Sequence, residues 1–397
     1  MFQKLSLSTF FILLLTFLVG LLPVKTEFPK LIKQDIDDYD LYDLHFTRSE
    51  STVVEVPSYR DTNIVLLQIG QDRQTIVRQL YELIRLAPRV IAVDALFRQP
   101  SADSSADQML RELIESSESI IVSSRLEKDD STGGLFERRS FFDSDRFDGR
   151  HGYDNFIGER TSTVRSFAPF YRSEGRDFVS FAARVVEKYR KDDFDYLRKR
   201  GKTTEFIQYK GNIEQFYSFT RVDFFEFLAT GQLEEKVRGR IVLLGHFEKP
   251  FPNSLEDLHF TPLNEQVGGR SFPDMYGVVI QANIVQMMLN KDYITKLAPI
   301  YSYMLAALLI FVVLWAEYRW EKKKGKAPPF WFHLGEAVLL VLLVFLLLLL
   351  FSGTGIRFAL YPIIFSFVAK GFYVPVYNWV RLILVRWRTA KTKKVNT

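Results

Sequence analysis

Residues 63–93 read NIVLLQIGQDRQTIVRQLYELIRLAPRVIAV. The continuous apolar runs at 63–69 and 90–93 have the length and the Ile and Val content of buried strands. Between them, apolar residues recur at helical spacing from Ile76 to Ile84, and Pro88 ends the pattern. This stretch therefore predicts a strand, a helix and a second strand.

The same alternation continues along the chain. Residues 106–114 have a helical pattern, and residues 120–123 and 240–244 are further apolar runs. Apolar periodicity also predicts helices at 178–189, 222–229 and 277–289, with loops and antiparallel edge strands at 141–170. Because buried strands alternate with helices, we predict an α/β domain with a mainly parallel central sheet.

Four other apolar stretches have the composition of membrane-spanning helices. They cover residues 5–24, 297–316, 330–351 and 358–380. A cleaved signal peptide is the alternative for the first, but no small-x-small cleavage site follows it, so we predict an uncleaved signal anchor. The expected architecture is one N-terminal and three C-terminal transmembrane helices flanking a domain at 27–296.

Charge is distributed unevenly between these regions. Residues 27–296 carry 37 Lys and Arg against 44 Asp and Glu, whereas the rest of the chain carries 15 against 3. An acidic domain of this kind argues against nucleic-acid binding. Positive charges are concentrated in the loop 317–329 and the tail 381–397, where they mark the cytoplasmic side and can contact anionic lipid. We therefore expect both termini inside the cell and the 27–296 domain outside it.

Two ionisable residues lie within the predicted spans, Glu336 in the third and Lys370 in the fourth. At about 1.5 Å per helical residue, their depths from the cytoplasmic side differ by about 6 Å, which a lysine side chain can bridge. They therefore either form an ion pair between the spans or extend separately to the inner membrane surface.

Acidic residues follow several of the predicted strands. Asp72, Asp94 and Asp257 lie at or after carboxyl ends of strands, the edge at which open α/β sheets bind ligands. With Thr261 and Gln281 as hydrogen-bonding neighbours, they predict an acidic ligand pocket. The alternative is that each carboxylate caps a helix or braces a loop.

Signatures of catalysis and of metal binding are absent from the sequence. It contains no cysteine, no H-E-x-x-H, no G-x-S-x-G, no P-loop and no G-x-G-x-x-G motif. His246, Asp257 and His259 are suitable metal-ligand types, but their spacing matches no metal motif. We therefore predict no catalytic residue, no metal and no cofactor, and we do not expect an enzyme.

Several segments resemble a known sensory family in their order and spacing. They are residues 42–46 (YDLHF), 67–72 (LQIGQD), 89–97 (RVIAVDALF) and 152–156 (GYDNF), and a closing block of 239–245, Asp257, Thr261-Pro262, 276–278 and Ala282-Asn283. With three spans after the domain, this layout resembles the second type of CHASE domain, the extracellular sensory domain associated with bacterial cyclases and histidine kinases. The turn at 69–73 lacks the family's usual Asp-Glu-Ser.

The resemblance implies a sensor in a bacterial inner membrane, which binds an unknown extracytoplasmic signal and transmits it through its spans. Family members generally continue into a cytoplasmic kinase or cyclase domain, and residues 381–397 are too few for one, so we expect a separate signalling partner. A parallel homodimer is implied in the same way. Two alternatives stay open: an envelope scaffold whose domain binds another protein and, with less support, an envelope enzyme.

Overall fold

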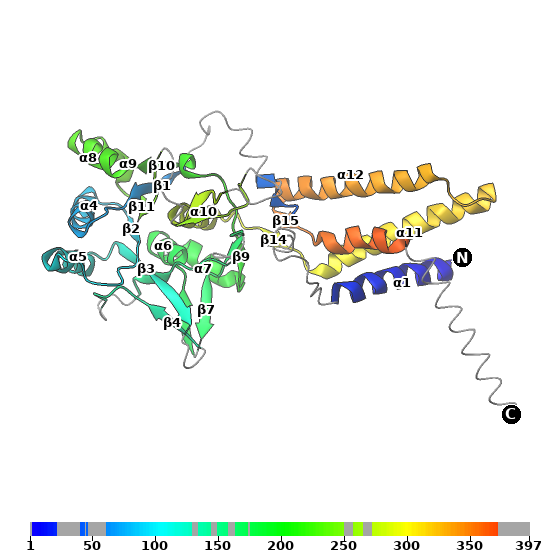
Figure 1. Cartoon of the computed structure of the whole chain (residues 1–397), viewed down its shortest axis with the longest axis horizontal. Coiled ribbons are helices and arrows are strands. Elements are labelled where there is room, and N and C mark those ends of the chain that lie inside the picture. Colours follow the sequence, from blue (N-terminus) through cyan, green and yellow to red (C-terminus); the bar gives the residue numbers. More distant parts are fainter. Residues whose placement is uncertain are drawn as a thin grey trace, which may run out of the picture. The chain divides into compact units, whose positions relative to one another are not determined.

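The structure of the chain is a computed structural model, and it describes residues 2–21, 40–43, 45–46, 61–128, 134–143, 149–157, 163–173, 175–249, 257–264 and 272–371. The chain divides into two compact units (Figure 1). One unit is Pro29–Ile294, and the other combines Met1–Phe28 with Thr295–Thr397.

A seven-stranded sheet lies at the centre of the Pro29–Ile294 unit (Figure 1). Its strands are β1 (Asp61–Gln68), β2 (Val90–Asp94), β3 (Ile120–Lys128), β4 (Leu135–Arg138), β5 (His151–Tyr153), β10 (Phe216–Phe219) and β11 (Ile241–Gly245). Their order is β10-β1-β11-β2-β3-β4, and β5 pairs with β3. Every pair is parallel except β3–β4. The predicted α/β domain with a mainly parallel sheet is therefore confirmed.

Helices cover both faces of this sheet, which explains why its strands are continuously apolar. Leu66 of β1 lies opposite Leu243 of β11, which lies opposite Ala92 of β2, and all three are fully buried. One face shares a hydrophobic core with α4 (Arg73–Leu86), α5 (Ser104–Ser116), α8 (Arg221–Ala229) and α9 (Leu233–Val237). On the other face, α6 (Phe181–Tyr189) and α10 (Gly277–Asn290) contact the strands, and α7 (Lys191–Arg200) packs against these two helices.

The bounds of α4 follow from its local sequence. Asp72 precedes the helix, and its carboxylate accepts a hydrogen bond from the Thr75 backbone N–H at 2.8 Å. At the other end, Ala87 adopts the left-handed conformation with φ 50°, and Pro88 follows it. A side-chain cap and a left-handed residue are the usual signals for the two ends of a helix.

The predicted helix at 178–189 begins later than expected. Phe178 and Val179 belong to β8 (Arg176–Val179), which forms an antiparallel hairpin with β7 (Phe170–Ser173). α6 starts only at Phe181, because the Ser180 side chain caps it. The remaining short elements are β6 (Ser166–Phe167), β9 (Glu205–Phe206), η2 (Ile213–Gln215), β12 (Leu258–His259) and β13 (Met275–Tyr276).

The second unit consists mainly of apolar helices. They are α1 (Phe2–Leu21), α11 (Pro299–Lys324), α12 (Phe330–Thr354) and the shorter segment Leu360–Gly371, with a two-stranded pair of β14 (Thr295–Lys296) and β15 (Ile356–Arg357). Within the described residues, α11 and α12 are long and apolar enough to cross a membrane, with mean hydropathies of 2.0 and 3.0. The predicted spans at 5–24 and 358–380 run into residues outside the described part, and the apolar segments seen there are shorter, Leu5–Leu18 and Leu360–Gly371. The structure therefore gives two candidate spans, where the sequence predicts four.

These helices pack into a bundle. Ile12 of α1 and Ile310 of α11 are fully buried in one apolar cluster with Ala369. The Tyr361 hydroxyl donates a hydrogen bond to the Thr16 carbonyl at 2.8 Å, so the segment after β15 also contacts α1.

Candidate functional site

The carboxyl ends of the central strands meet the first turn of α10. Asp94, the last residue of β2, lies opposite Gly245, the last residue of β11. A Cβ atom at Gly245 would lie 2.6 Å from Val278 Cγ2 of α10 and 3.3 Å from Asp94 Cβ. Glycine at this position therefore allows α10 to begin directly against the edge of the sheet.

Asp257 lies at the same helix end. Its backbone is left-handed with φ 60°, and its carbonyl accepts a hydrogen bond from the N–H of Gly277, the first residue of α10, at 3.1 Å. A Cβ atom at Gly277 would lie 3.0 Å from Asp257 Oδ1, so the carboxylate lies against the start of the helix. The N-terminal end of a helix dipole favours such a negative charge.

Asp154 completes the acidic edge and was not among the predicted site residues. It follows β5 directly, and its Oδ1 lies 3.4 Å from Arg125 Nη1. The Asp154 carbonyl accepts a hydrogen bond from the Gln281 side chain of α10 at 3.3 Å. Gln281 thus connects α10 to the acidic edge. Asp154 was missed from the sequence because the strand before it, β5, has three residues, too few to show a period.

Two carboxylates of this edge, Asp94 and Asp154, have raised pKa values. Burial, followed by the charges of Asp154 and Asp257, raises the pKa of Asp94 well above its ordinary value, against the opposing effect of Arg125. Burial also raises the pKa of Asp154 to about 6, again opposed by Arg125. Asp94 keeps partial solvent exposure, and no hydrogen bond to its carboxylate comes from a residue that the structure describes. Asp94 and Asp154 thus share the charge of one guanidinium, and such a cluster is suited to binding a proton or another positive charge.

The other predicted site residues lie in different surroundings. Thr261 is buried, and both its N–H, at 2.8 Å, and its hydroxyl bond to the carboxylate of Asp274. Asp274 was not predicted, and burial raises its pKa to about 6. Asp72 is the exposed cap of α4, and hydrogen bonds from Thr75 lower its pKa. The structure therefore brings together Asp94, Asp257 and Gln281, and it gives Asp72 the capping role that was the alternative.

The structure also places Glu336 and Lys370 together. Lys370 Nζ lies 2.6 Å from Glu336 Oε2 and 2.6 Å from Glu317 Oε1 of α11. The side chain of His333 adds a contact of 3.3 Å from its Nδ1 to Glu336 Oε2. Glu317, His333 and Glu336 are spaced closely enough to hold a metal ion, but the Lys370 ammonium already lies between the two carboxylates and neutralises part of their charge.

The chain therefore combines an α/β domain that has an acidic sheet edge with a unit of apolar helices. A model of the CHASE2 domain matches residues 11–316. The chain therefore belongs to the CHASE2 domain family, a family of extracellular sensory domains, and the resemblance seen in the sequence is confirmed. No curated protein and no solved structure matches the chain.

Proposed function

We propose that the chain is a membrane-anchored sensor that binds a positively charged signal at the acidic edge and passes the bound state to a separate partner protein. The observation that carries this proposal is the position of α10. Its first residue, Gly277, lies against the carboxylate of Asp257, and Gln281 one turn later donates to the carbonyl of Asp154. α10 ends at Asn290, and α11 begins at Pro299.

A signal acts on this arrangement through charge. A cation bound at this edge relieves the repulsion that Asp154 and Asp257 exert on Asp94, which the Arg125 guanidinium only partly offsets. If two positions of α10 differ in how they place Asp257 and Gln281, the ligand favours the position with the higher affinity. The short connection to α11 then carries the difference into the membrane segments.

The membrane arrangement is part of the proposal. Four spans at 5–24, 297–316, 330–351 and 358–380, with the basic 317–329 loop and 381–397 tail inside, place both termini in the cytoplasm of a bacterium. The loop and the tail are then the parts that a cytoplasmic partner can reach. A parallel homodimer and a binding role without catalysis belong to the same proposal.

The test is affinity purification of the tagged full chain in mild detergent from its native membranes, followed by mass spectrometry. The proposal predicts stoichiometric recovery of a kinase, a cyclase or another regulator. A chain carrying Arg and Lys to Gln changes in the 317–329 loop serves as the matched control, because it is expected to lose that partner. Recovery of envelope proteins alone would support a scaffold instead, and would contradict signalling through a partner.

A further inference from the structure

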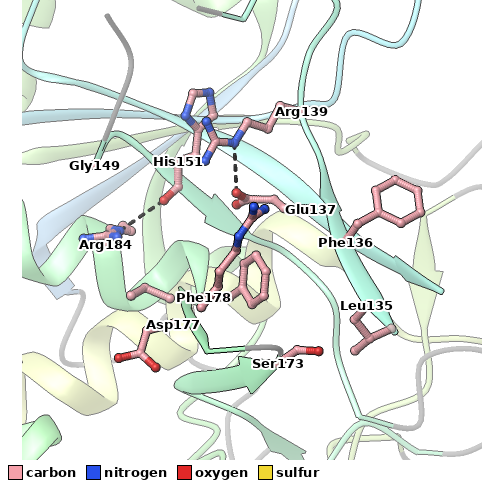
Figure 2. Close-up of a pocket in the computed structure, with 12 residues that line it drawn as sticks. Leu135, Phe136, Glu137, Arg139, Gly149, His151, Ser173, Asp177, Phe178 and Arg184 are labelled. Carbon is pink, nitrogen blue, oxygen red and sulfur yellow. Dashed lines mark hydrogen bonds and ion pairs between the residues drawn. The ribbon is translucent and has the colours of Figure 1, made fainter. Parts of the chain in front are cut away.

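A hollow lies in the Pro29–Ile294 unit, and its lining contains no residue of α10. It has a volume of about 620 Å³ and is lined by β4, β5, the β7–β8 hairpin and α6. Leu135 and Phe136 lie on one side of it, and His151 and Arg184 lie on the other (Figure 2). The volume falls within the range of small-molecule sites.

Most of the charged groups around this hollow are engaged with one another. Arg139 Nε donates to Glu137 Oε2 at 2.9 Å, and Arg184 Nε donates to the His151 carbonyl at 3.1 Å (Figure 2). Asp177 also lines the hollow, and its Oδ1 accepts a hydrogen bond at 2.5 Å from Nε of Arg172, which is not a lining residue. These contacts hold the walls of the hollow and leave little charge to attract a ligand.

Arg176 is the exception. It lines the hollow from the first position of β8 and is exposed. No carboxylate of the described residues pairs with its guanidinium, whereas Arg139, Arg172 and Arg184 each have such a partner. A guanidinium presents a planar pair of donors that matches a carboxylate, so this side chain is available for an anionic ligand.

Apolar side chains lie beside this cation. Leu135 and Phe178 also line the hollow, whereas the Phe136 ring points away from Phe178 and carries the Arg138 guanidinium at 5.4 Å (Figure 2). A half-buried aromatic ring, Phe178, near an available arginine suits a ligand with an apolar ring and a negative group. The acidic edge described above has the opposite charge and would repel such a ligand.

We infer that this hollow binds a small aromatic carboxylate, with the carboxylate on Arg176 and the ring against Leu135 and Phe178. This site is separate from the acidic edge and does not depend on the signalling role proposed for that edge. His151, the first residue of β5, lines the hollow, and Asp154, the residue after β5, belongs to the acidic edge.

The test is isothermal titration calorimetry of the full chain in lipid nanodiscs, with benzoate, phenylacetate and indole-3-acetate, each paired with its uncharged amide. At least one carboxylate is expected to bind with a dissociation constant below about 1 mM, and its amide at least tenfold more weakly. Arg176→Gln is expected to weaken carboxylate binding by about tenfold or more, because it removes a charge-assisted contact.

Arg85→Gln is the matched control, since Arg85 is a 65% exposed arginine on α4, outside the hollow. It is expected to bind the carboxylates as the wild type does. A second variant, Phe178→Ala, is expected to weaken the larger ring ligands while keeping the preference for carboxylate over amide. Absence of binding in the wild type, equal binding of acid and amide, or wild-type affinity in the Arg176→Gln chain would each overturn the inference.

Discussion

Asp154 is a carboxylate held among other carboxylates. Its side chain is 18% exposed, and burial raises its pKa to about 6 although Arg125 lies 3.4 Å away. Asp94 beside it is shifted in the same direction. The charge of the acidic edge therefore changes close to neutral pH, where isolated aspartates are fully ionised.

The substitution Asp154→Asn tests this assignment. Because the pKa is about 6 in the folded chain and 3.8 ordinarily, the favourable contribution of Asp154 is complete below pH 3.8 and is lost as the pH rises through 6. Asn stays neutral, so the variant is expected to have a larger free energy of unfolding than the wild type at pH 7.5, by up to about 3 kcal/mol, and therefore a higher unfolding temperature. Near pH 4 the two chains are expected to unfold at the same temperature. Thermal unfolding of the full chain across this pH range measures the difference.

Asp72→Asn is the control for that experiment. Hydrogen bonds from Thr75 lower the pKa of Asp72, so the sign is opposite and no gain is expected at pH 7.5. A gain of equal size in both variants, or none for Asp154→Asn, would show that the acidic edge does not raise the pKa of this carboxylate.

At the scale of elements, α4 and α10 show how local sequence positions the edge. α4 ends at Ala87, which adopts the left-handed conformation. The Ala87 carbonyl accepts a hydrogen bond at 3.1 Å from the N–H of Gly239, which lies just before β11. α10 starts against the sheet because Gly245 and Gly277 leave room for Val278 and for the Asp257 carboxylate. Small residues at these points set the approach of helix to strand.

Ala87→Gly is expected to stabilise the domain. A left-handed backbone costs a residue with a Cβ about 1 kcal/mol or more, and glycine removes most of this cost while losing some entropy in the unfolded chain. We expect the free energy of unfolding, measured with urea, to rise by about 0.5–1 kcal/mol. The control is Ala106→Gly, at a buried position in the first turn of α5, which is expected to lose stability. A loss for Ala87→Gly would mean that the left-handed backbone there carries no cost.

The helices of the second unit are joined by a charge cluster. Lys370→Met removes the ammonium that lies 2.6 Å from both Glu317 Oε1 and Glu336 Oε2, and it leaves two carboxylates without a cation between them. We expect a loss of about 3 kcal/mol, seen as a lower unfolding temperature in detergent, because breaking a buried pair leaves an uncompensated charge.

Two variants make the Lys370 prediction specific. Lys370→Met combined with Glu336→Gln is expected to be less damaging than Lys370→Met alone, since one carboxylate is removed with its partner. Lys326→Met, at an exposed position between α11 and α12, should have no effect. Equal losses in the single and double variants would mean that Glu336 and Lys370 do not interact.

The long periodic elements could be predicted from the sequence, whereas the short ones could not. The runs at 63–69, 90–93 and 240–244 became β1, β2 and β11, because buried parallel strands need continuous apolar residues. The β7–β8 hairpin and β5 have only three or four residues per strand, too few for a period. Asp94 was correctly predicted at the carboxyl end of a strand, whereas Asp257 lies immediately before β12 and not after a strand. Asp154 depends on β5 pairing with β3, which is a tertiary contact without a local signal.

At the scale of the whole molecule, the proposal requires the 27–296 domain and the 317–329 loop to lie on opposite sides of the membrane. The sequence has no cysteine, so single cysteines can report the side of the membrane without background. In spheroplasts, a membrane-impermeant maleimide is expected to label Ser116→Cys in the domain and to leave Lys323→Cys unlabelled until the membrane is opened. Both positions are exposed, so accessibility within the fold does not limit the reaction. Labelling of Lys323→Cys in sealed spheroplasts would contradict the proposed orientation.

The central claim is that the state of the acidic edge reaches the membrane segments, and tryptophan fluorescence tests it most directly. All tryptophans of the chain follow residue 296, at Trp315, Trp320, Trp331, Trp379 and Trp387. Emission of the full chain in nanodiscs, recorded from pH 5 to pH 8, therefore reports on the second unit while the proton acts as a probe of Asp154. The account predicts an emission change with a midpoint near pH 6 in the wild type that is lost in Asp154→Asn and kept in Asp72→Asn. A flat profile in the wild type, or the same profile in Asp154→Asn, would contradict it.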